Sequence, residues 1–248
     1  MNAFGKRPGY GCGYRNGIPP AFEKHLFHEL HPAAARGMSD RLKIGRGWRK
    51  PELMRVDPDK RRKDIAQVTI DLVAREGLAA ATFRRIAAEG SWSTASITNY
   101  FVDKQDLLVW TFQVLSVEGE RRFEEALDIS ENDPVPALLT MVPWCPANVR
   151  RWKAYLAFWD AAVRDPELAA LLADSTSVGM NLLERLVSRS LRAGAGARGA
   201  VELLNATIQG VALQMLVDHR GWSEAKIRAI LLESHKSAIG RFAAASSM

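Results

Sequence analysis

The sequence predicts an all-α protein. Apolar residues recur at the three- and four-residue spacing of amphipathic helices through most of the chain after residue 56, and helix-capping residues precede several of these stretches. No stretch of five or more residues shows the strict apolar–polar alternation that a half-buried strand needs. We therefore expect three short helices near the beginning of this region and a larger helical domain after them.

The composition is that of an ordinary globular chain, with 248 residues of which 47% are hydrophobic and 25% charged. Its uninterrupted apolar runs are far shorter than the roughly 20 residues that cross a bilayer, and the N-terminus lacks the pattern of a signal peptide. We therefore expect a cytoplasmic protein with no membrane partner. Two cysteines, Cys12 and Cys145, cannot form a disulfide framework or a four-ligand zinc site, so no metal or cofactor is expected.

Residues 1–56 form a distinct basic segment that is rich in glycine and proline. They carry a net charge of +7, whereas the other 192 residues carry −1. The segment lacks a sustained helical period and is predicted to be disordered. An alternative is that the native chain begins at Met54 or Met38. The overall charge of +6 therefore does not itself predict nucleic-acid binding by the folded part.

The first three predicted helices are delimited by capping residues. Asp57 precedes a helix that ends at Gly77, where a left-handed glycine would stop it. Thr82 caps a second helix that runs from Phe83 to about Gly90. Ser93 caps a third, from Thr94 to about Tyr100. The side chains predicted to face inward are Ile65, Val68, Leu72, Val73, Phe83, Ile86, Ala87, Ile97 and Phe101.

The rest of the chain is predicted to form longer helices. Asp103 and Asp106 resemble a capping pair for a helix that reaches about Leu127, and two proline-bearing breaks follow it. Ser223 is a good cap for the last helix. The amphipathic stretches after the breaks are Asn148–Arg164, Pro166–Leu191, Ala200–Asp218 and Ser223–Ala244.

The three short helices have the layout of a helix-turn-helix, in which the third helix lies in the DNA major groove. The outward positions of this helix carry short polar groups and an aromatic that can reach phosphates and base edges. They are Ser93, Thr94, Ser96, Thr98, Asn99 and Tyr100. Thr98 and Asn99 are the better candidates for base contacts, because capping alone explains Ser93. Arg84 and Arg85 are candidate phosphate contacts by charge, with a solvated face or an ion pair as the equal alternative.

The segment from Arg85 to Phe101, followed by Lys104 and Leu107-Leu108, resembles the DNA-binding domain of the tetracycline-repressor (TetR) family. The resemblance implies a helix-turn-helix over Thr82–Phe101, with Thr82, Tyr100 and Lys104 holding phosphates. Two residues depart from the family pattern. Ser91 stands where the turn glycine is usual, and Trp92 replaces a small aliphatic residue. We expect a reshaped turn in which Trp92 fills additional core space.

The segment from Arg151 to Leu168 is similar to the choline-sensing, BetI-type branch of that family. The resemblance implies a DNA-binding domain over 57–105 and an effector-binding and dimerisation domain over 106–248. Trp152, Tyr155 and Trp159 share one helical stripe, which can box a quaternary ammonium by cation–π attraction, although such a stripe is more often simply core. Trp110 is a further candidate for the same cavity. The helices at 177–191 and 200–218 are expected to pair across a homodimer.

Taken together, these features predict a sequence-specific DNA-binding regulator, a repressor that a small effector releases from double-stranded operator DNA. Two alternatives remain open. An architectural DNA-binding dimer would have no effector, but it would not need so many aromatic rings in its C-terminal half. A helical enzyme is disfavoured because the sequence has no nucleophile elbow, zinc-protease or phosphate-loop motif.

Overall fold

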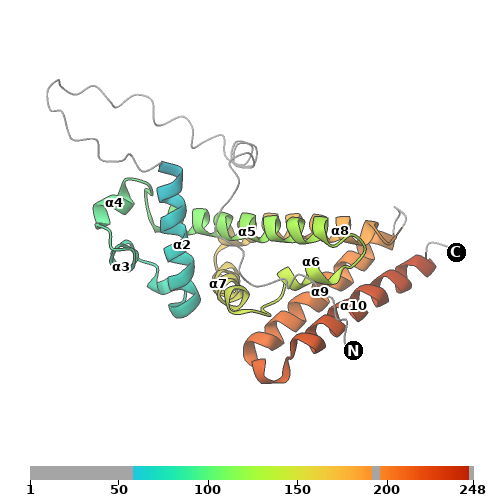
Figure 1. Cartoon of the computed structure of the whole chain (residues 1–248). Helices are drawn as coiled ribbons and strands as arrows, with labels where there is room; N and C mark the ends of the chain where they lie inside the picture. The colour runs from blue at the N-terminus through green and yellow to red at the C-terminus, as the bar shows by residue number, and fades with distance from the viewer. Residues whose placement is uncertain (1–57, 192–195, 246–248) are drawn as a thin grey trace. The chain divides into compact units, whose positions relative to one another are not determined.

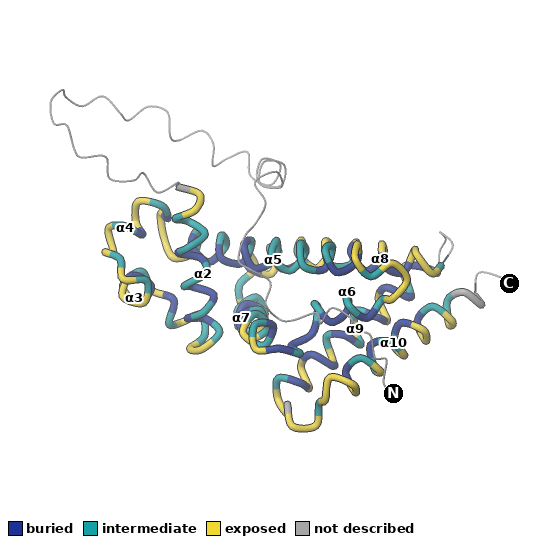
Figure 2. Tube along the Cα trace, in the orientation of Figure 1, coloured by how far each residue is buried: buried dark blue, intermediate teal, exposed yellow. Residues whose placement is uncertain are grey.

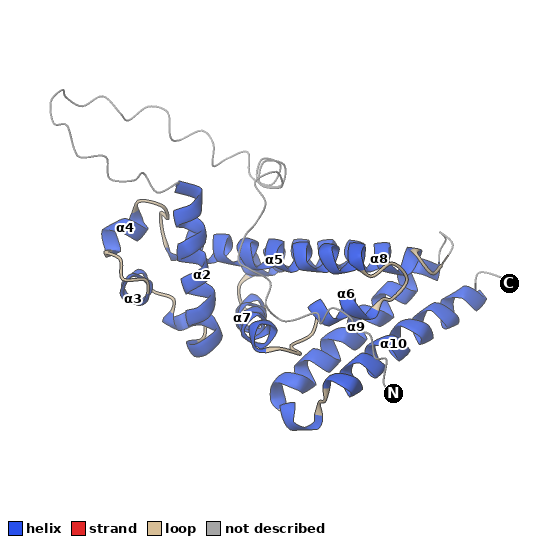
Figure 3. Cartoon of the chain, viewed as in Figure 1, coloured by secondary structure: helices blue, strands red, loops and turns tan. Residues whose placement is uncertain are grey.

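The protein is represented by a computed structural model that describes residues 58–191 and 196–245. Every regular element in these two ranges is helical, which confirms the all-α prediction (Figure 3). The basic extension over 1–56 and its proposed start sites lie outside the described residues. The α-helices, labelled as in Figure 1, are α2 (Pro58–Glu76), α3 (Phe83–Glu89), α4 (Thr94–Thr98), α5 (Lys104–Ile129), α6 (Val135–Thr140), α7 (Pro146–Ala162), α8 (Pro166–Ser188), α9 (Gly196–Val217) and α10 (Glu224–Ala245).

The predicted caps at Thr82, Ser93 and Asp103 form as side-chain hydrogen bonds, whereas Asp57 lies outside the described residues. The Thr82 hydroxyl accepts from the Arg85 amide at 3.3 Å, and the Ser93 hydroxyl accepts from the Ser96 amide at 3.1 Å. Asp103 and Asp106 make a reciprocal pair at the start of α5: one carboxylate accepts from the Asp106 amide at 2.8 Å, and the other accepts from the Val102 amide at 3.0 Å. These bonds satisfy amides that the first helical turn leaves without partners. The helix starts are therefore set locally by the sequence.

The turn between α3 and α4 is built around Gly90, Ser91 and Trp92. Ser91 has φ +55°, a left-handed conformation in which the family pattern places a glycine. Trp92 folds back over Gly90, where an added Cβ would lie 2.4 Å from the indole ring. Arg61 of α2 makes a cation–π contact with the same indole, with its guanidinium carbon 5.3 Å from the Trp92 ring centroid. The turn thus keeps its left-handed residue, and the glycine is displaced by one position to make room for Trp92.

Substituting Ser91→Gly should stabilise the protein. A non-glycine residue in the left-handed region is strained, and relief of this strain outweighs the extra chain entropy of glycine, for a net gain of about 0.5–1 kcal/mol in the free energy of unfolding. Denaturant unfolding measures this change. Gly90→Ala is the matched contrast and should destabilise by about 1–3 kcal/mol because its methyl group overlaps Trp92. A loss of stability in Ser91→Gly would refute this account of the turn.

The helix-turn-helix has a buried core that continues into the helices after it. Of the side chains predicted to face inward, Ile65, Ile86, Ile97 and Phe101 are almost completely buried. Figure 2 shows buried positions, in dark blue, along α2 and α5. The same cluster includes Phe112 of α5 and Phe158 of α7. A second cluster unites α6, α8, α9 and α10 with the C-terminal half of α5. The two-domain division at residue 105 stays a prediction, since apolar packing runs across that position.

The structure has one helix that was not predicted, and one predicted helix begins four residues earlier than expected. The region between the proline-bearing breaks contains α6, because Pro134 and Pro136 lie at the first turn, where a missing amide hydrogen costs little. Helix α9 begins at Gly196 rather than Ala200. Residue 199 inside this helix is a glycine because the Phe242 ring fills the space beside it. A Cβ atom at this position would lie 2.3 Å from that ring.

Helix α9 also has the length and apolar composition of a membrane span over Ala197–Val217. One face of this segment packs into the second core cluster through Val201, Leu204, Ile208 and Met215, all nearly inaccessible. The buried helix of a globular protein has the same composition, so this property does not indicate a membrane.

Candidate DNA-binding face and ligand cavity

Helix α4 presents several of the predicted DNA-binding side chains to the surface. Thr94, Thr98 and Asn99 are exposed, while Ile97 on the opposite side is completely buried. The Thr98 hydroxyl donates to the Ala95 carbonyl at 3.2 Å and keeps its acceptor lone pairs available. A short helix held by one buried isoleucine and ending in an exposed hydroxyl and amide is suited to reading base edges.

Ser93 and Ser96 are more strongly engaged than their neighbours. In addition to the capping bond, the two hydroxyls lie 2.8 Å apart in a hydrogen bond with each other. Ser93 therefore has a sufficient structural role, as its capping position predicted. Any DNA contact from this pair would have to share hydroxyl groups that are already used.

The basic and aromatic side chains predicted to contact DNA phosphates differ in how far they are exposed and in whether they already have a partner. Arg84 and Lys104 are exposed, and Tyr100 is half-buried against the first core cluster. Arg85 instead pairs with Glu76 of α2, at 2.6 Å. The ion pair that was the alternative for Arg85 is thus formed, although half of its side chain remains accessible and such surface pairs are weak. Lys104 begins α5, so it lies at the end of the helix that continues to the cavity described next (Figure 1).

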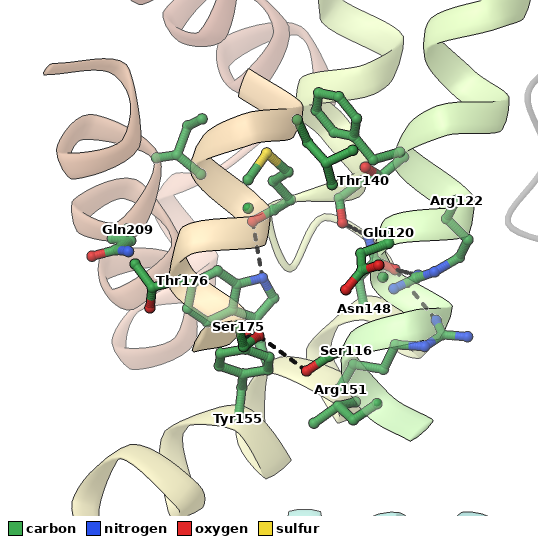
Figure 4. Close-up of a pocket in the computed structure, with 18 of the residues that line it drawn as sticks. Ser116, Glu120, Arg122, Thr140, Asn148, Arg151, Tyr155, Ser175, Thr176 and Gln209 are labelled. Atoms are coloured by element: carbon green, nitrogen blue, oxygen red, sulfur yellow. Dashed lines mark hydrogen bonds between the residues drawn. The ribbon is translucent and has the colours of Figure 1, made fainter. Parts of the chain in front are cut away.

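A cavity of about 160 Å³ opens between α5, the end of α6, α7, α8 and α9 (Figure 4). It is at the small end for ligand pockets, which commonly span roughly 300–1,000 Å³, so it suits a small molecule. Its apolar wall includes Leu115, Phe123, Leu182 and Ile208. Its polar groups come from all five of these helices.

Three of the four predicted ligand residues lie together in this cavity. Trp152, Tyr155 and Trp159 line it, and their ring centroids are 6.0–6.4 Å apart. The Trp152 indole donates to the Met141 carbonyl at 3.0 Å, and the Tyr155 hydroxyl bonds to the Ser175 hydroxyl at 2.8 Å. The rings are therefore fixed in place, as a preformed aromatic wall requires.

The prediction for Trp110 is wrong for this cavity. Trp110 does not line it; its ring lies under Arg62 of α2, whose guanidinium carbon is 4.0 Å from the ring centroid. Arg62 also stacks on Phe101, at 5.1 Å. Trp110 is in the first turns of α5, where the helix packs against the helix-turn-helix, so its aromatic character serves the junction between helices rather than a ligand.

The sequence analysis missed the polar residues of the cavity. They are Ser116, Glu120, Arg122, Thr140, Asn148, Arg151, Ser175, Thr176, Asn205 and Gln209. Ser116, Glu120 and Phe123 follow a helical i, i+4, i+7 spacing on one face of α5, which was a usable signal. Among the described residues, no group of three side chains is arranged to hold a metal ion.

Glu120 is the most perturbed carboxyl group in the cavity. Burial, and secondarily the nearby charge of Glu124, raise its pKa to about 7. Within the described part of the chain its carboxylate makes no hydrogen bond or ion pair that would offset this cost. A buried carboxyl group with a pKa near neutrality marks a candidate binding site.

Replacing Glu120 with glutamine should change how stability depends on pH. The folded carboxyl group holds its proton up to about pH 7, whereas the unfolded one loses it near 4.5, so Glu120 makes the free energy of unfolding fall as pH rises between these values. Glu120→Gln should lack this contribution and gain stability relative to the wild type as pH increases. Denaturant midpoints from pH 5 to 8 test it, with the exposed Glu184→Gln as control. Parallel curves for wild type and Glu120→Gln would contradict it.

The comparisons with known proteins agree with this architecture. Residues 137–239 match the family described as the C-terminal region of BetI-type transcriptional repressors. The HTH-type regulator PksA of Bacillus subtilis is 26% identical over 190 residues, covering 73% of this chain and 91% of PksA. BetI of Serratia proteamaculans is 28% identical over 177 residues, covering 68% and 88%.

Solved structures share the fold. A transcriptional regulator from Rhodococcus superposes with a TM-score of 0.65 at 19% identity, over 72% of this chain and 96% of that one. A regulator from Saccharomonospora viridis, solved in complex with choline, has a TM-score of 0.61 at 21% identity, over 71% and 95%. A helix-turn-helix joined to a larger helical region defines this class of protein, the DNA-binding transcriptional regulators. Within that class, the chain is similar to TetR-family regulators, and its residues 137–239 match the BetI-type C-terminal region.

Proposed function

We propose that this regulator is a cytoplasmic homodimeric repressor, and that a small effector bound in the α5–α9 cavity releases it from operator DNA. The single observation that carries the proposal is the placement of α5. Lys104 begins this helix next to the recognition helix, and Ser116 and Glu120 of the same helix line the cavity. A rigid helix with one end at each site can bias both.

Helix α7 supplies a second connection between the cavity and the helix-turn-helix. Arg151 and Tyr155 line the cavity, while the adjacent Arg150 pairs with Asp71 of α2 at 3.1 Å. A ligand that moves α7 would therefore also displace Arg150 and change its ion pair with Asp71 of the DNA-binding helices. The proposed mechanism is a population shift between two spacings of the recognition helices, one of which matches successive major grooves about 34–36 Å apart.

The proposed dimer face follows α9. Leu203, Leu213 and Val217 are 37%, 47% and 80% exposed, and together with Ala206 and Gly210 they form one apolar stripe at helical spacing. We place α10 beside it, since α10 packs along α9. Several large apolar side chains of 177–191, such as Leu183 and Val187, are buried inside the chain, whereas Val178 is 37% exposed and could reach a partner.

A quaternary amine is the candidate effector class. The support is the fixed aromatic wall of Trp152, Tyr155 and Trp159 with the carboxyl group of Glu120 in the same cavity, a combination that attracts an organic cation. The structural relative from Saccharomonospora viridis, which was solved with choline, is consistent with this choice.

The test of the proposed function begins with operator selection from a random DNA pool. In a mobility-shift assay, choline and related amines should lower affinity for the selected site and, by mass action, raise the melting temperature of the free protein. Trp159→Ala should retain operator binding and lose the response. An operator complex that no tested amine weakens or stabilises would favour the architectural alternative.

A further inference from the structure

Two cationic side chains share one side of the cavity. Arg122 and Arg151 both line it, and burial lowers the pKa of both; that of Arg122 falls to about 10, so it stays protonated at neutral pH. The partners of Arg122 are uncharged: its Nε donates to the Glu118 main-chain carbonyl at 3.1 Å, and its Nη1 donates to the Asn148 amide oxygen at 2.6 Å. In the described part of the chain, no carboxylate forms an ion pair with Arg122.

The Asn148 amide is held so that its oxygen faces these cations. Its nitrogen donates to the carbonyls of Leu139, Thr140 and Val142 at 3.0–3.4 Å, which fixes the orientation of the group. Its oxygen accepts from Arg122 and, at 3.5 Å, from Arg151 (Figure 4). Arg151 has one distant carboxylate, that of Glu118, at 3.7 Å. A neutral dipole therefore lies between two guanidinium groups, and the site is short of negative charge.

The opposite charge occurs in the same cavity. Glu120 lies close enough to the aromatic wall for its negative charge to contribute, after burial, to the raised pKa of Tyr155. Its carboxylate lacks a cationic partner in the described structure, as noted above. The cavity thus contains an unpaired carboxyl group beside an aromatic wall, and beside Asn148 two cations that have one ion-pair partner between them, the Glu118 carboxylate 3.7 Å from Arg151.

We propose that the effector is a small zwitterion, an onium group joined by a short chain to a carboxylate. Its carboxylate binds Arg122 and Arg151, and its onium group binds Glu120 and the aromatic wall. This inference rests on the proposed function and narrows its effector class. A simple quaternary amine would leave two arginines with the Glu118 carboxylate as their one ion-pair partner, and a simple carboxylate would leave Glu120 without a counter-charge, whereas a zwitterion adds the missing charge at both ends and no net charge.

A matched set of probes tests this on the full chain by calorimetry. The zwitterions are trimethylammonio carboxylates with one, two or three methylene groups between the charges. The tightest of them is compared with its tert-butyl isostere, which lacks the positive charge, and with the trimethylammonium alcohol of the same length, which lacks the carboxylate. We expect the zwitterion to bind about tenfold or more tightly than either analogue, since each analogue leaves one buried charge unpaired.

Two variants assign the ends of the ligand. Arg151→Gln should remove the preference for the zwitterion over the alcohol, and Glu120→Gln should remove its preference over the tert-butyl carboxylate. Lys153→Gln, which removes an exposed cation from the same helix, should change neither. Circular dichroism verifies folding, and the wild-type ranking stands without any variant.

The outcomes separate this inference from the proposed function. The zwitterion inference is overturned if the alcohol or the tert-butyl carboxylate binds as tightly as the best zwitterion or more tightly. It is also overturned if none of the zwitterions binds. If the alcohol nevertheless weakens the operator complex, effector release stands. If a zwitterion binds as expected and operator affinity is unchanged, the binding site stands and effector release fails.

Discussion

Thr98→Ala combined with Asn99→Ala should abolish operator binding while leaving the protein folded and dimeric. Both side chains are exposed at the end of α4, and neither contributes to the core. A good side-chain contact to a base is worth about 1–3 kcal/mol, and a dimer would lose four such groups, so we expect operator affinity to fall by about 10³-fold or more. Mobility shifts at fixed salt measure the change.

The control for this pair is Asn132→Ala, which removes an exposed amide from the turn after α5. It should leave operator affinity unchanged. Sedimentation and thermal unfolding should give wild-type dimerisation and stability for both proteins, because the only bond lost is the local one from Thr98 to Ala95. Operator affinity that survives in the double variant would refute the assignment of this helix end to the major groove.

The helix-turn-helix could be predicted from sequence because its determinants are local. Thr82, Ser93 and Asp103 each cap a helix within three residues of their own position, and the bonds formed as expected. The inward positions of three short helices are likewise fixed by helical spacing. The shift of the turn glycine from position 91 to position 90 could also be read from the sequence. Its cause is the packing of the Trp92 ring over Gly90, a tertiary contact that the sequence alone does not reveal.

The cavity was only half predictable, for a different physical reason. Trp152, Tyr155 and Trp159 belong to one helix, so their spacing alone brings them to one face. Trp110 could not be placed in this way, because the side chain that covers it, Arg62, comes from another helix. The charged groups of the cavity come from α5 and α7 and meet only through tertiary packing, so each looked like part of a solvated face.

Asn148→Ala should be strongly destabilising. The side chain is 4% exposed and is the shared partner of three carbonyl groups in the last turn of α6 and just after it, and of two guanidinium groups. Its removal leaves Arg122 buried without its closest acceptor, at 2.6 Å, and the carbonyls without a donor. Since each buried polar group left without a partner costs about 1–3 kcal/mol, and a charged one more, we expect a loss of about 3–5 kcal/mol in the free energy of unfolding, measured by denaturant titration.

Asn205→Ala provides the control from the same cavity. Asn205 is half-buried on α9, and its amide oxygen accepts one long bond, at 3.4 Å from Gln209, so its loss should cost less than about 1 kcal/mol. Asn148→Asp should be less destabilising than Asn148→Ala, because its carboxylate can accept hydrogen bonds from both arginines and adds a negative charge beside them. It should remain less stable than the wild type, because a carboxylate cannot donate to the three carbonyl groups. A loss below about 1 kcal/mol in Asn148→Ala would mean that the amide is not what holds Arg122 and Arg151 in place.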